Sequence, residues 1–352
     1  MMAAICFLAP SIFACPQPSL DTNEHSANLE RYIQTLAALR KRLQSNLFKL
    51  LASRDTPRLL VEANCYPVYQ SLRDGLHRAG LGEIYQPGDV AKIIEQILRD
   101  ADCCEDVTGI DAFLADPISV SSPMEYVGDS AQKELQENQY IALALGLHMG
   151  IFPRDLLWVV GRKSAKNSST DPKPELLVAA TIQDIESYHE ELNSSVPFPV
   201  DECVSFDESV ESICSDVDLC RLSENLTATS LSELIALAWD RSDYAANDDC
   251  PHWTIGGSFF QDVIEQNLQN NPIVFRSLMA ACVSTIGATE MSKVHPLRTG
   301  RGGNNPQVRC RDASAWRRDI DREFHLHYWS RAGSYQFASC GVHGDFSIPD
   351  PT

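Results

Sequence analysis

Short apolar runs alternate with amphipathic helical patterns in the first half of the chain, and this alternation limits the possible folds more than any other feature. The runs cover residues 5–13, 156–162 and 175–182, and the clearest helical pattern repeats leucine and isoleucine at spacings of three and four over residues 29–50. Apolar runs of strand length are typical of strands that are buried on both faces. Such strands between helices predict an α/β domain with a partly parallel sheet.

The last third of the chain changes to a different pattern. Two helices are expected over residues 256–269 and 271–288. After them, polarity alternates with period two over residues 307–311, 323–329 and 334–342, as in strands whose two faces differ. A helical pair followed by an antiparallel meander predicts a smaller C-terminal α+β module.

The length and the acidic residues predict how these parts are joined. At 352 residues the chain exceeds the usual size of one compact core. Residues 184–224 contain 12 acidic residues and one basic residue, so this stretch is expected to bury little apolar surface. We therefore expect an acidic α/β domain over residues 1–183, an acidic linker or arm over residues 184–228, and the α+β module over residues 229–352.

The charge of the chain is uneven. The whole chain carries 29 basic and 48 acidic residues, a net charge of −19, which argues against a protein that coats nucleic acid or an anionic membrane. Residues 293–331 differ, because they hold nine basic residues against four acidic ones. The sequence therefore predicts a basic surface in the α+β module, and RNA or DNA as its partner.

The apolar segments and the cysteines predict the compartment. No apolar run reaches the roughly 18 residues that a membrane span needs, so no membrane partner is expected. The 12 cysteines are scattered and form no C-x-x-C pair, which favours reduced thiols over a disulfide framework. Residues 1–16 contain no basic residue and are interrupted by Pro10, which favours a buried strand over a signal peptide. A cytoplasmic location is the resulting prediction.

The basic segment also contains the residue types that a ribonuclease needs. Guanidinium groups pair with phosphates, imidazoles transfer protons near neutral pH, and an indole provides a stacking surface. Because side chains alternate between the two faces of a strand, His325, His327 and Trp329 are expected on one face. The predicted nucleic-acid contacts are Arg298, Arg301, Arg309, Arg317, Arg322 and Trp329. The alternative is that the arginines pair with nearby acids and that the aromatic residues fill a core.

The order of motifs in this segment resembles that of RelE/ParE-like bacterial toxins. The helical pair is followed by HPLR at 295–298, RCR at 309–311, HLHYW at 325–329 and a closing GVHGDFSIP at 341–349. The resemblance implies helices followed by a sheet, with basic and imidazole side chains around a substrate phosphate. On that basis, the catalytic residues of a metal-independent ribonuclease would be Arg311, Arg318, His327 and His343.

Two metal sites are open alternatives, although no cofactor is predicted. Zinc ligands could converge from one strand pair, and the candidates are His325, His327, Cys340 and His343. Carboxylates near element ends could bind Mg²⁺ as in PIN-like nucleases, and the candidates are Glu62, Asp89, Asp129, Glu134 and Asp155. The Gly-rich residues 300–305 lack the P-loop pattern and precede a strand, so they do not predict a phosphate cradle.

These patterns together predict a bacterial nucleic-acid-directed effector. It would be an RNase-like toxin or a component of a defence system, restrained by its acidic half. The alternative is a non-enzymatic interaction subunit that uses the arginine-rich face to dock an acidic partner protein. Whether the chain is an enzyme is left open by the sequence.

Overall fold

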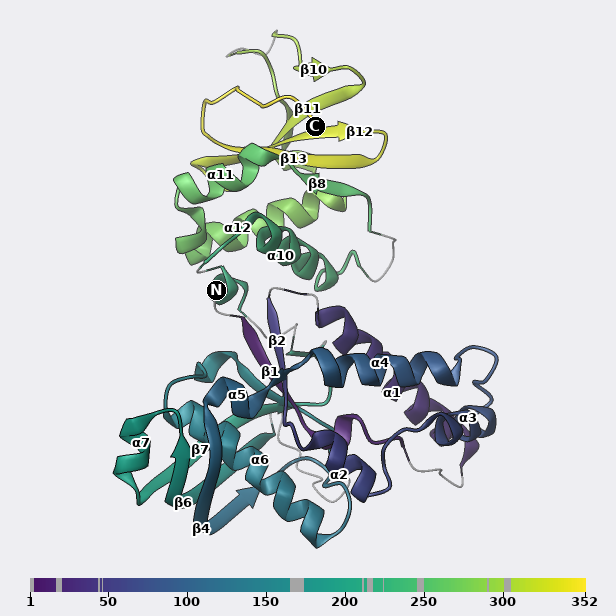
Figure 1. Cartoon of the computed structure of the whole chain (residues 1–352). Coiled ribbons are helices and arrows are strands. Elements are labelled where there is room, and N and C mark those ends of the chain that lie inside the picture. Colours follow the sequence, from purple (N-terminus) through teal and green to yellow (C-terminus); the bar gives the residue numbers. More distant parts are fainter. Residues whose placement is uncertain are drawn as a thin grey trace. The chain divides into compact units, whose positions relative to one another are not determined.

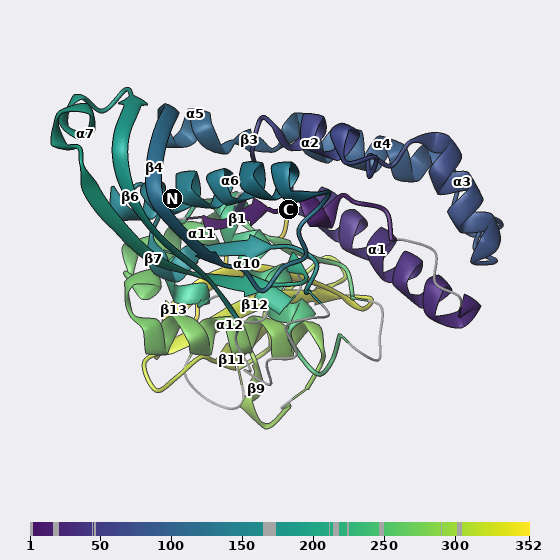
Figure 2. The ribbon, with the colours of Figure 1, turned by 90° about the horizontal axis from the view of Figure 1, so that it is seen from below.

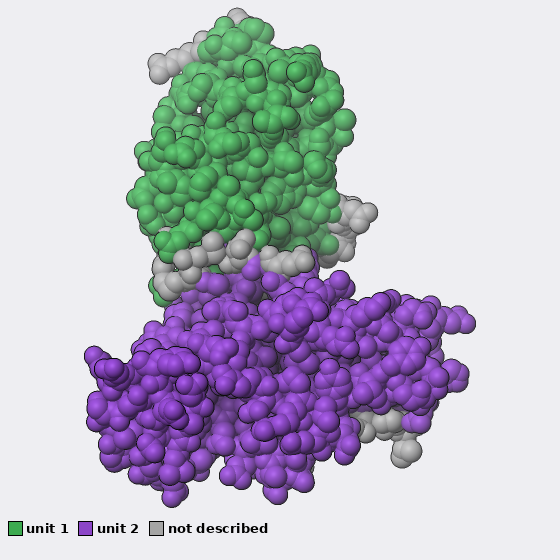
Figure 3. Space-filling view, in the orientation of Figure 1, with its two compact units in different colours: residues 1–2, 217–352 green, residues 3–216 purple. Residues whose placement is uncertain are grey.

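The chain forms two compact units. A computed structural model describes residues 3–16, 21–43, 45, 47–164, 174–210, 212–213, 218–223, 225–245, 250–289, 291–300 and 305–352. Unit 1 comprises Met1–Met2 and Val217–Thr352, and unit 2 comprises Ala3–Asp216 (Figure 3). Each unit contains one mixed β-sheet with helices, which confirms the expected mixed α/β class.

Unit 2 is built around a seven-stranded sheet (Figure 1). Its strands are β1 (Ala4–Leu8), β2 (Phe48–Ala52), β3 (Asp102–Cys103), β4 (Ile110–Ser121), β5 (Leu157–Val160), β6 (Glu175–Ser187) and β7 (Phe198–Asp207). Its α-helices are α1 (Thr22–Arg42), α2 (Thr56–Glu62), α3 (Tyr69–Arg78), α4 (Pro87–Asp100), α5 (Cys104–Thr108), α6 (Ser130–His148) and α7 (Glu190–Ser195). Short 3₁₀ turns precede two of these elements, η1 (Pro10–Ile12) and η2 (Arg154–Leu156).

The strand order in this sheet is β3-β2-β1-β5-β7-β6-β4. The first five of these strands run parallel, whereas β6 runs antiparallel to both of its neighbours, β7 and β4. All five residues of β1 are buried, as expected of a two-sided central strand. The predicted apolar strands at the start of the chain and after residue 155 are therefore neighbours in one parallel layer.

One face of the antiparallel side of the sheet is covered by α6. This helix contacts β4, β6 and β7, and ten of its residues are buried. Asp129 caps the helix by accepting a hydrogen bond from the backbone N–H of Ala131, and Gln132 completes a capping box. β6 and β7 alternate between buried and exposed residues, so only one of their faces joins this core.

Residues 184–207 do not form the predicted acidic arm. They complete β6, form α7, and supply β7, which lies between β5 and β6 in the sheet. Val200, Val204 and Phe206 point into the core, while acidic residues such as Asp201 occupy the exposed face of β7. Glu202 is buried and forms an ion pair with Arg154. Acidic composition therefore marked the outer face of a core strand, and the boundary between the units falls at residues 216 and 217.

Unit 1 contains a six-stranded sheet with helices on one side. Its strands are β8 (Trp253–Ile255), β9 (Val294–Pro296), β10 (Arg309–Cys310), β11 (Ala313–Asp319), β12 (Phe324–Arg331) and β13 (Ser334–Val342). Its helices are α9 (Leu219–Leu222), α10 (Ala228–Asp240), α11 (Gly257–Glu265) and α12 (Pro272–Ile286), with 3₁₀ turns η3 (Leu268–Asn270) and η4 (Met291–Lys293).

The order in this second sheet is β10-β11-β12-β13-β8, and β9 pairs with β11. The meander β10 to β13 is antiparallel, as predicted, whereas β8 adds a parallel edge strand that the sequence did not indicate. The predicted helical pair corresponds to α11 and α12. Asn271 caps α12 and Pro272 occupies its first turn, which explains the break between the two helices.

The two faces of the small sheet are both covered. One face of the sheet packs against the helices. It carries Trp316 and Arg318 of β11 and their register partners on β12 and β13, and the ring of Phe337 on β13 lies 5.6 Å from that of Phe259 on α11. The other face is crossed by the C-terminal residues 345–352, whose Phe346 and Ile348 pack on a small apolar cluster. We call residues 345–352 the C-terminal tail.

Candidate functional site

The strand order of unit 2 creates a crevice beside β1. The chain passes from β1 outward to β2 and β3 on one side, and later adds β5 and β7 on the other side. The segments that follow β1 and β5 leave the sheet side by side, where the N–H of Ala9 donates to the carbonyl oxygen of Val160 and the N–H of Arg162 donates to Oγ of Ser11. In open parallel sheets, ligands bind at this switch in strand order, beyond the carboxyl ends of the strands.

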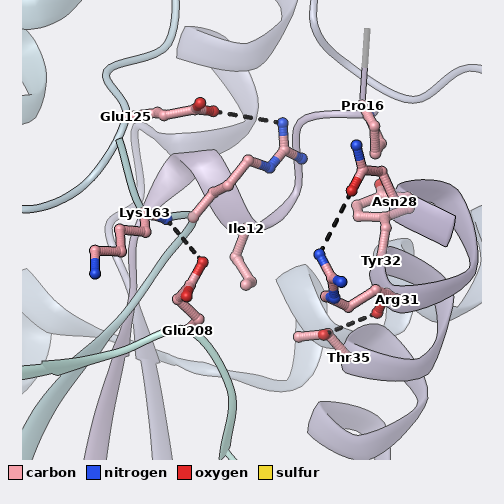
Figure 4. A pocket seen from close by; sticks show the side chains of 10 residues that line it. Ile12, Pro16, Asn28, Arg31, Tyr32, Thr35, Glu125, Lys163 and Glu208 are labelled. Atoms are coloured by element: carbon pink, nitrogen blue, oxygen red, sulfur yellow. Dashed lines mark hydrogen bonds and ion pairs between the residues drawn. The ribbon is translucent and has the colours of Figure 1, made fainter. Parts of the chain in front are cut away.

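A pocket of about 470 Å³ lies at this position (Figure 4). One wall comes from α1, and the facing wall comes from the segments that follow β5 and β7 and from Glu125. Ile12 and Pro16 come from the segment after β1. The lining residues are Ile12, Pro16, Asn28, Arg31, Tyr32, Thr35, Glu125, Arg162, Lys163 and Glu208. We call this pocket the switch-point pocket.

The switch-point pocket has more positive than negative side chains. Arg31, Arg162 and Lys163 line it together with two carboxylates, Glu125 and Glu208. This balance contrasts with the net charge of −19 of the whole chain. A concave site with an excess of cations favours an anionic ligand, because low-dielectric walls strengthen the field inside a cleft.

Arg162 is held in place by three separate contacts. Its Nη1 lies 3.7 Å from Oε2 of Glu125, and its Nη2 donates a hydrogen bond to the carbonyl oxygen of Ala14. Its backbone N–H donates to Oγ of Ser11 at 3.0 Å. The guanidinium is therefore oriented before any ligand arrives, which lowers the entropy cost of binding.

Gly161 permits the close approach of the segments that form the pocket. A Cβ atom at this position would lie 2.7 Å from Sδ of Met124 and 3.0 Å from Cβ of Ala9. The residues on either side of Met124 pair with the segment after β5, where the N–H of Glu125 donates to the carbonyl oxygen of Arg162 at 2.8 Å. A side chain on Gly161 would separate the walls that place Arg162 and Glu125.

The remaining polar groups at the pocket indicate binding rather than covalent chemistry. Tyr32 donates a hydrogen bond from its hydroxyl to the carbonyl oxygen of Phe13 at 2.8 Å, and burial raises its pKa. Burial also raises the pKa of the nearby Cys15 thiol to about 11, an effect that the charge of Arg162 only partly offsets. At neutral pH this thiol is protonated and is a poor nucleophile.

The four residues that the toxin resemblance implied do not come together in unit 1. Arg311 precedes β11, whereas His343 follows β13 at the opposite end of the sheet. The 7 residues of β11 at about 3.3 Å each place roughly 20 Å between these ends. Arg318 and His327 point to opposite faces of the sheet, because they occupy adjacent register rows of β11 and β12. The predicted catalytic arrangement is therefore not formed.

Arg318 has a structural role. It is almost completely buried on the helix-facing side, where its Nη2 donates to the carbonyl oxygens of Thr289 at 2.6 Å and of Ser284 at 3.2 Å. Ser284 lies in the last turn of α12, and Thr289 follows the end of that helix by three residues. The side chain thus fixes α12 to the sheet.

We expect Arg318→Met to lower the free energy of unfolding by about 2–3 kcal/mol, because it leaves buried carbonyls without a charged donor. Urea unfolding followed by tryptophan fluorescence measures this, since Trp316 and Trp329 lie in the same sheet. Arg322→Met is the matched control, because Arg322 is exposed and should stay within about 0.5 kcal/mol of the parent. Wild-type stability of Arg318→Met would contradict the structural role.

His327 and Trp329 are buried under the C-terminal tail rather than exposed. Nδ1 of His327 lies 3.1 Å from the carbonyl oxygen of Ser347, and Nε1 of Trp329 donates to that of Pro349 at 2.8 Å. Burial lowers the pKa of His327 to about 4, so this imidazole is neutral at physiological pH. The alternating pattern located both side chains on one face correctly, but that face is part of the interior.

The predicted nucleic-acid contacts are dispersed over unit 1. Arg309, Arg311 and Arg322 are exposed, and none of them forms an ion pair with another described residue. Arg298 donates to the carbonyl oxygen of Asn305, and Arg317 lies half-buried on the tail-covered face. Arg301 lies outside the described residues.

No predicted metal site is formed. Within the described ranges, no group of three or more His, Cys, Asp or Glu side chains is placed to hold a metal ion. Cys340 faces the helices, next to Cys282, whereas His325 and His327 lie on the other face. Of the five predicted Mg²⁺ ligands, Asp129 caps α6, and Glu62 and Asp89 belong to ion pairs within their own helices.

Comparisons with known proteins give no relative. No family model, no curated protein and no solved structure matches this chain. Among the described residues, no helix is both long and apolar enough to cross a membrane. The switch-point pocket, which the sequence did not reveal, is therefore supported by its geometry alone.

Proposed function

We propose that unit 2 binds a small ligand with one phosphate group, of the size of a nucleoside monophosphate. The observation that carries this proposal is the position of the switch-point pocket, which has three cations at the carboxyl edge of a parallel sheet. Parallel sheets with this geometry bind nucleotides in many unrelated proteins, so the position supports the ligand class and not a particular compound.

The dimensions and charges of the pocket agree with this ligand class. Its volume of about 470 Å³ lies within the range of about 300–1,000 Å³ that small-molecule sites occupy. Three cations against two carboxylates suit a single phosphate better than a triphosphate. Glu125, Glu208 and Asn28 offer oxygen acceptors for the hydroxyl or amino groups of the rest of the ligand.

Two residues after β5 have separate roles in this proposal. Arg162 is pre-oriented by Glu125, Ala14 and Ser11, so its guanidinium can present a fixed pair of donors to a phosphate. Lys163 supplies a point charge on the same wall, where its backbone N–H lies 3.4 Å from Oε1 of Glu208.

Isothermal titration calorimetry of the full chain with adenosine monophosphate, inorganic phosphate and adenosine tests the proposal. We expect the monophosphate to bind best and adenosine to bind at least tenfold more weakly, because a charged hydrogen bond contributes about 1.5–3 kcal/mol. Arg162→Ala and Lys163→Ala should each weaken monophosphate binding by about tenfold or more. Arg99→Ala is the control, because Arg99 is exposed on α4 and pairs only with Asp100 among the described residues.

Two results would contradict the proposal. Equal affinity for adenosine and its monophosphate would show that the cations do not bind the phosphate. If Arg162→Ala and Arg99→Ala change the affinity equally, the ligand binds outside the switch-point pocket.

A second function, nucleic-acid binding by unit 1, is favoured by a separate observation. Arg309, Arg311 and Arg322 are exposed without ion-pair partners among the described residues. Arg311 also lines a shallow hollow of about 240 Å³ that contains Tyr335, a possible stacking surface for a base. This supports the nucleic-acid-directed part of the hypothesis, without the ribonuclease step.

The salt dependence of binding tests this second function. Each phosphate contact contributes about −0.7 to the slope of log affinity against log salt for single strands. We therefore expect the double variant Arg309→Glu, Arg311→Glu to reduce the magnitude of that slope by about 1.4. Arg58→Glu with Arg73→Glu is the control, since both arginines are exposed on helices of unit 2. Absent or salt-independent binding would instead favour docking of an acidic partner protein.

A further inference from the structure

Three imidazoles, a guanidinium and a carboxylate meet at the end of the unit 1 sheet that lies away from Arg311. Nε2 of His325 lies 3.1 Å from Oδ1 of Asp319, and the ring of His343 lies 5.1 Å from that of His325 at an angle of 36°. Arg317 lies on β11 diagonally across from His325 on β12, and His295 on β9 is the register partner of Arg317. We call these five residues the histidine cluster.

The strand pairing fixes the histidine cluster. Asp319 is the register partner of His325 across β11 and β12, and Arg317 is the register partner of His295 across β11 and β9. The backbone N–H of His343 donates to the carbonyl oxygen of Glu323 at 2.6 Å, which ties the end of β13 to the β11–β12 turn. Four backbone segments thus supply the five side chains, and the strand register fixes the positions of His295, Arg317, Asp319 and His325.

The members of the histidine cluster differ in exposure. His295 and His343 are exposed and Arg317 is half-buried, whereas His325 is buried. Nδ1 of His325 and Nε of Arg317 are buried and have no hydrogen-bond partner among the described residues. Such groups raise the energy of a folded protein unless a ligand or another polar group meets them.

We propose that the histidine cluster binds one phosphate group of a single-stranded nucleic acid through Arg317, His295 and His343. The inference rests on the nucleic-acid binding proposed for unit 1, and it is independent of the switch-point pocket. His325 is a positioning residue: it holds Asp319 through Nε2 and supports the ring of His343. A metal ion is not the favoured ligand, because the described residues place no set of three ligands together.

The charges around the cluster make phosphate binding depend on pH. Burial lowers the pKa of His325, and the charge of Asp319 raises it in part. Arg317, His343 and His295 lower this pKa further, so His325 stays neutral near pH 7. Asp345 of the C-terminal tail acts on the neighbouring His327, and Glu323 lies exposed beside His343. Histidine is the residue type that suits a pH-dependent phosphate site, so we expect phosphate binding to strengthen as the pH falls from 8 to 6.

Fluorescence anisotropy of the full chain with a single-stranded RNA oligonucleotide at pH 8 and pH 6 tests the inference. We expect the parent to bind more tightly at pH 6. His343→Gln and His295→Gln should each reduce that gain by about threefold, and Arg317→Gln should weaken binding by about threefold at both pH values. His77→Gln is the control, because His77 is exposed on α3 of unit 2.

The outcomes separate this inference from the proposal on which it rests. RNA binding that Arg309→Glu with Arg311→Glu weakens, but that none of the cluster variants changes at either pH, overturns the cluster and retains nucleic-acid binding. A parent that binds no RNA at either pH overturns both. A pH effect that His77→Gln reduces as much as His343→Gln assigns the effect to overall charge and also overturns the cluster.

Discussion

The central constraint in this protein is the position of β1 in the middle of a parallel sheet. β2 pairs on one side of β1 and β5 on the other, so the segments that follow β1 and β5 leave the sheet next to each other and line the pocket together with α1. Gly161 brings the backbone after β5 close to Ala9 and Met124, and this contact sets the width of the opening. The placement of Arg162, Lys163 and the α1 residues follows from that geometry. Figure 2 shows β1 and α1 in the ribbon turned by 90° from the view of Figure 1 and seen from below.

Unit 1 follows a different rule, in which both faces of a small sheet are closed. Arg318 secures the helix-facing side through the carbonyl oxygens of Ser284, in the last turn of α12, and of Thr289, just after that helix. The C-terminal tail closes the other side through His327 and Trp329, and Gly341 leaves room for the His327 ring, which would lie 2.6 Å from a Cβ there. Three side chains that were predicted for a functional site, Arg318, His327 and Trp329, therefore lie in the interior.

The sequence predicted the parts of the fold that depend on local pattern. The strand β1, which overlaps the apolar run 5–13, the pair α11 and α12, and the meander all follow from periodicity and capping. The leucine spacing over residues 29–50 predicted α1 correctly only as far as Arg42, because Phe48–Ala52 form the strand β2. Prediction from the sequence failed where the pairing of distant segments determines the fold. The acidic residues in and around β7 made this strand resemble a solvated arm in composition, although Val200, Val204 and Phe206 alternate along it and fill the core. In the same way, nothing local shows that residues 345–352 return to cover His327.

The candidate site was missed for the same reason. Arg162 and Lys163 follow a recognisable strand, but the sequence does not say that β5 lies next to β1, so it does not bring them opposite Arg31. Conversely, His325 and His343 were predicted from their chemistry alone. The pairing of His325 with Asp319, and the backbone hydrogen bond from His343 to Glu323, show that these two predicted residues lie near each other. Residue type suggested chemistry, whereas strand order determined which groups share a site.

Hydrogen exchange of the full chain with and without adenosine monophosphate tests the switch-point pocket most directly. The account predicts slower amide exchange in peptides that cover residues 9–16 and 161–164, with no change in β11 to β13, because the segments after β1 and β5 line the pocket and β11 to β13 do not. Protection confined to the strands of unit 1, or no protection at residues 9–16 and 161–164 at a saturating ligand concentration, would contradict it.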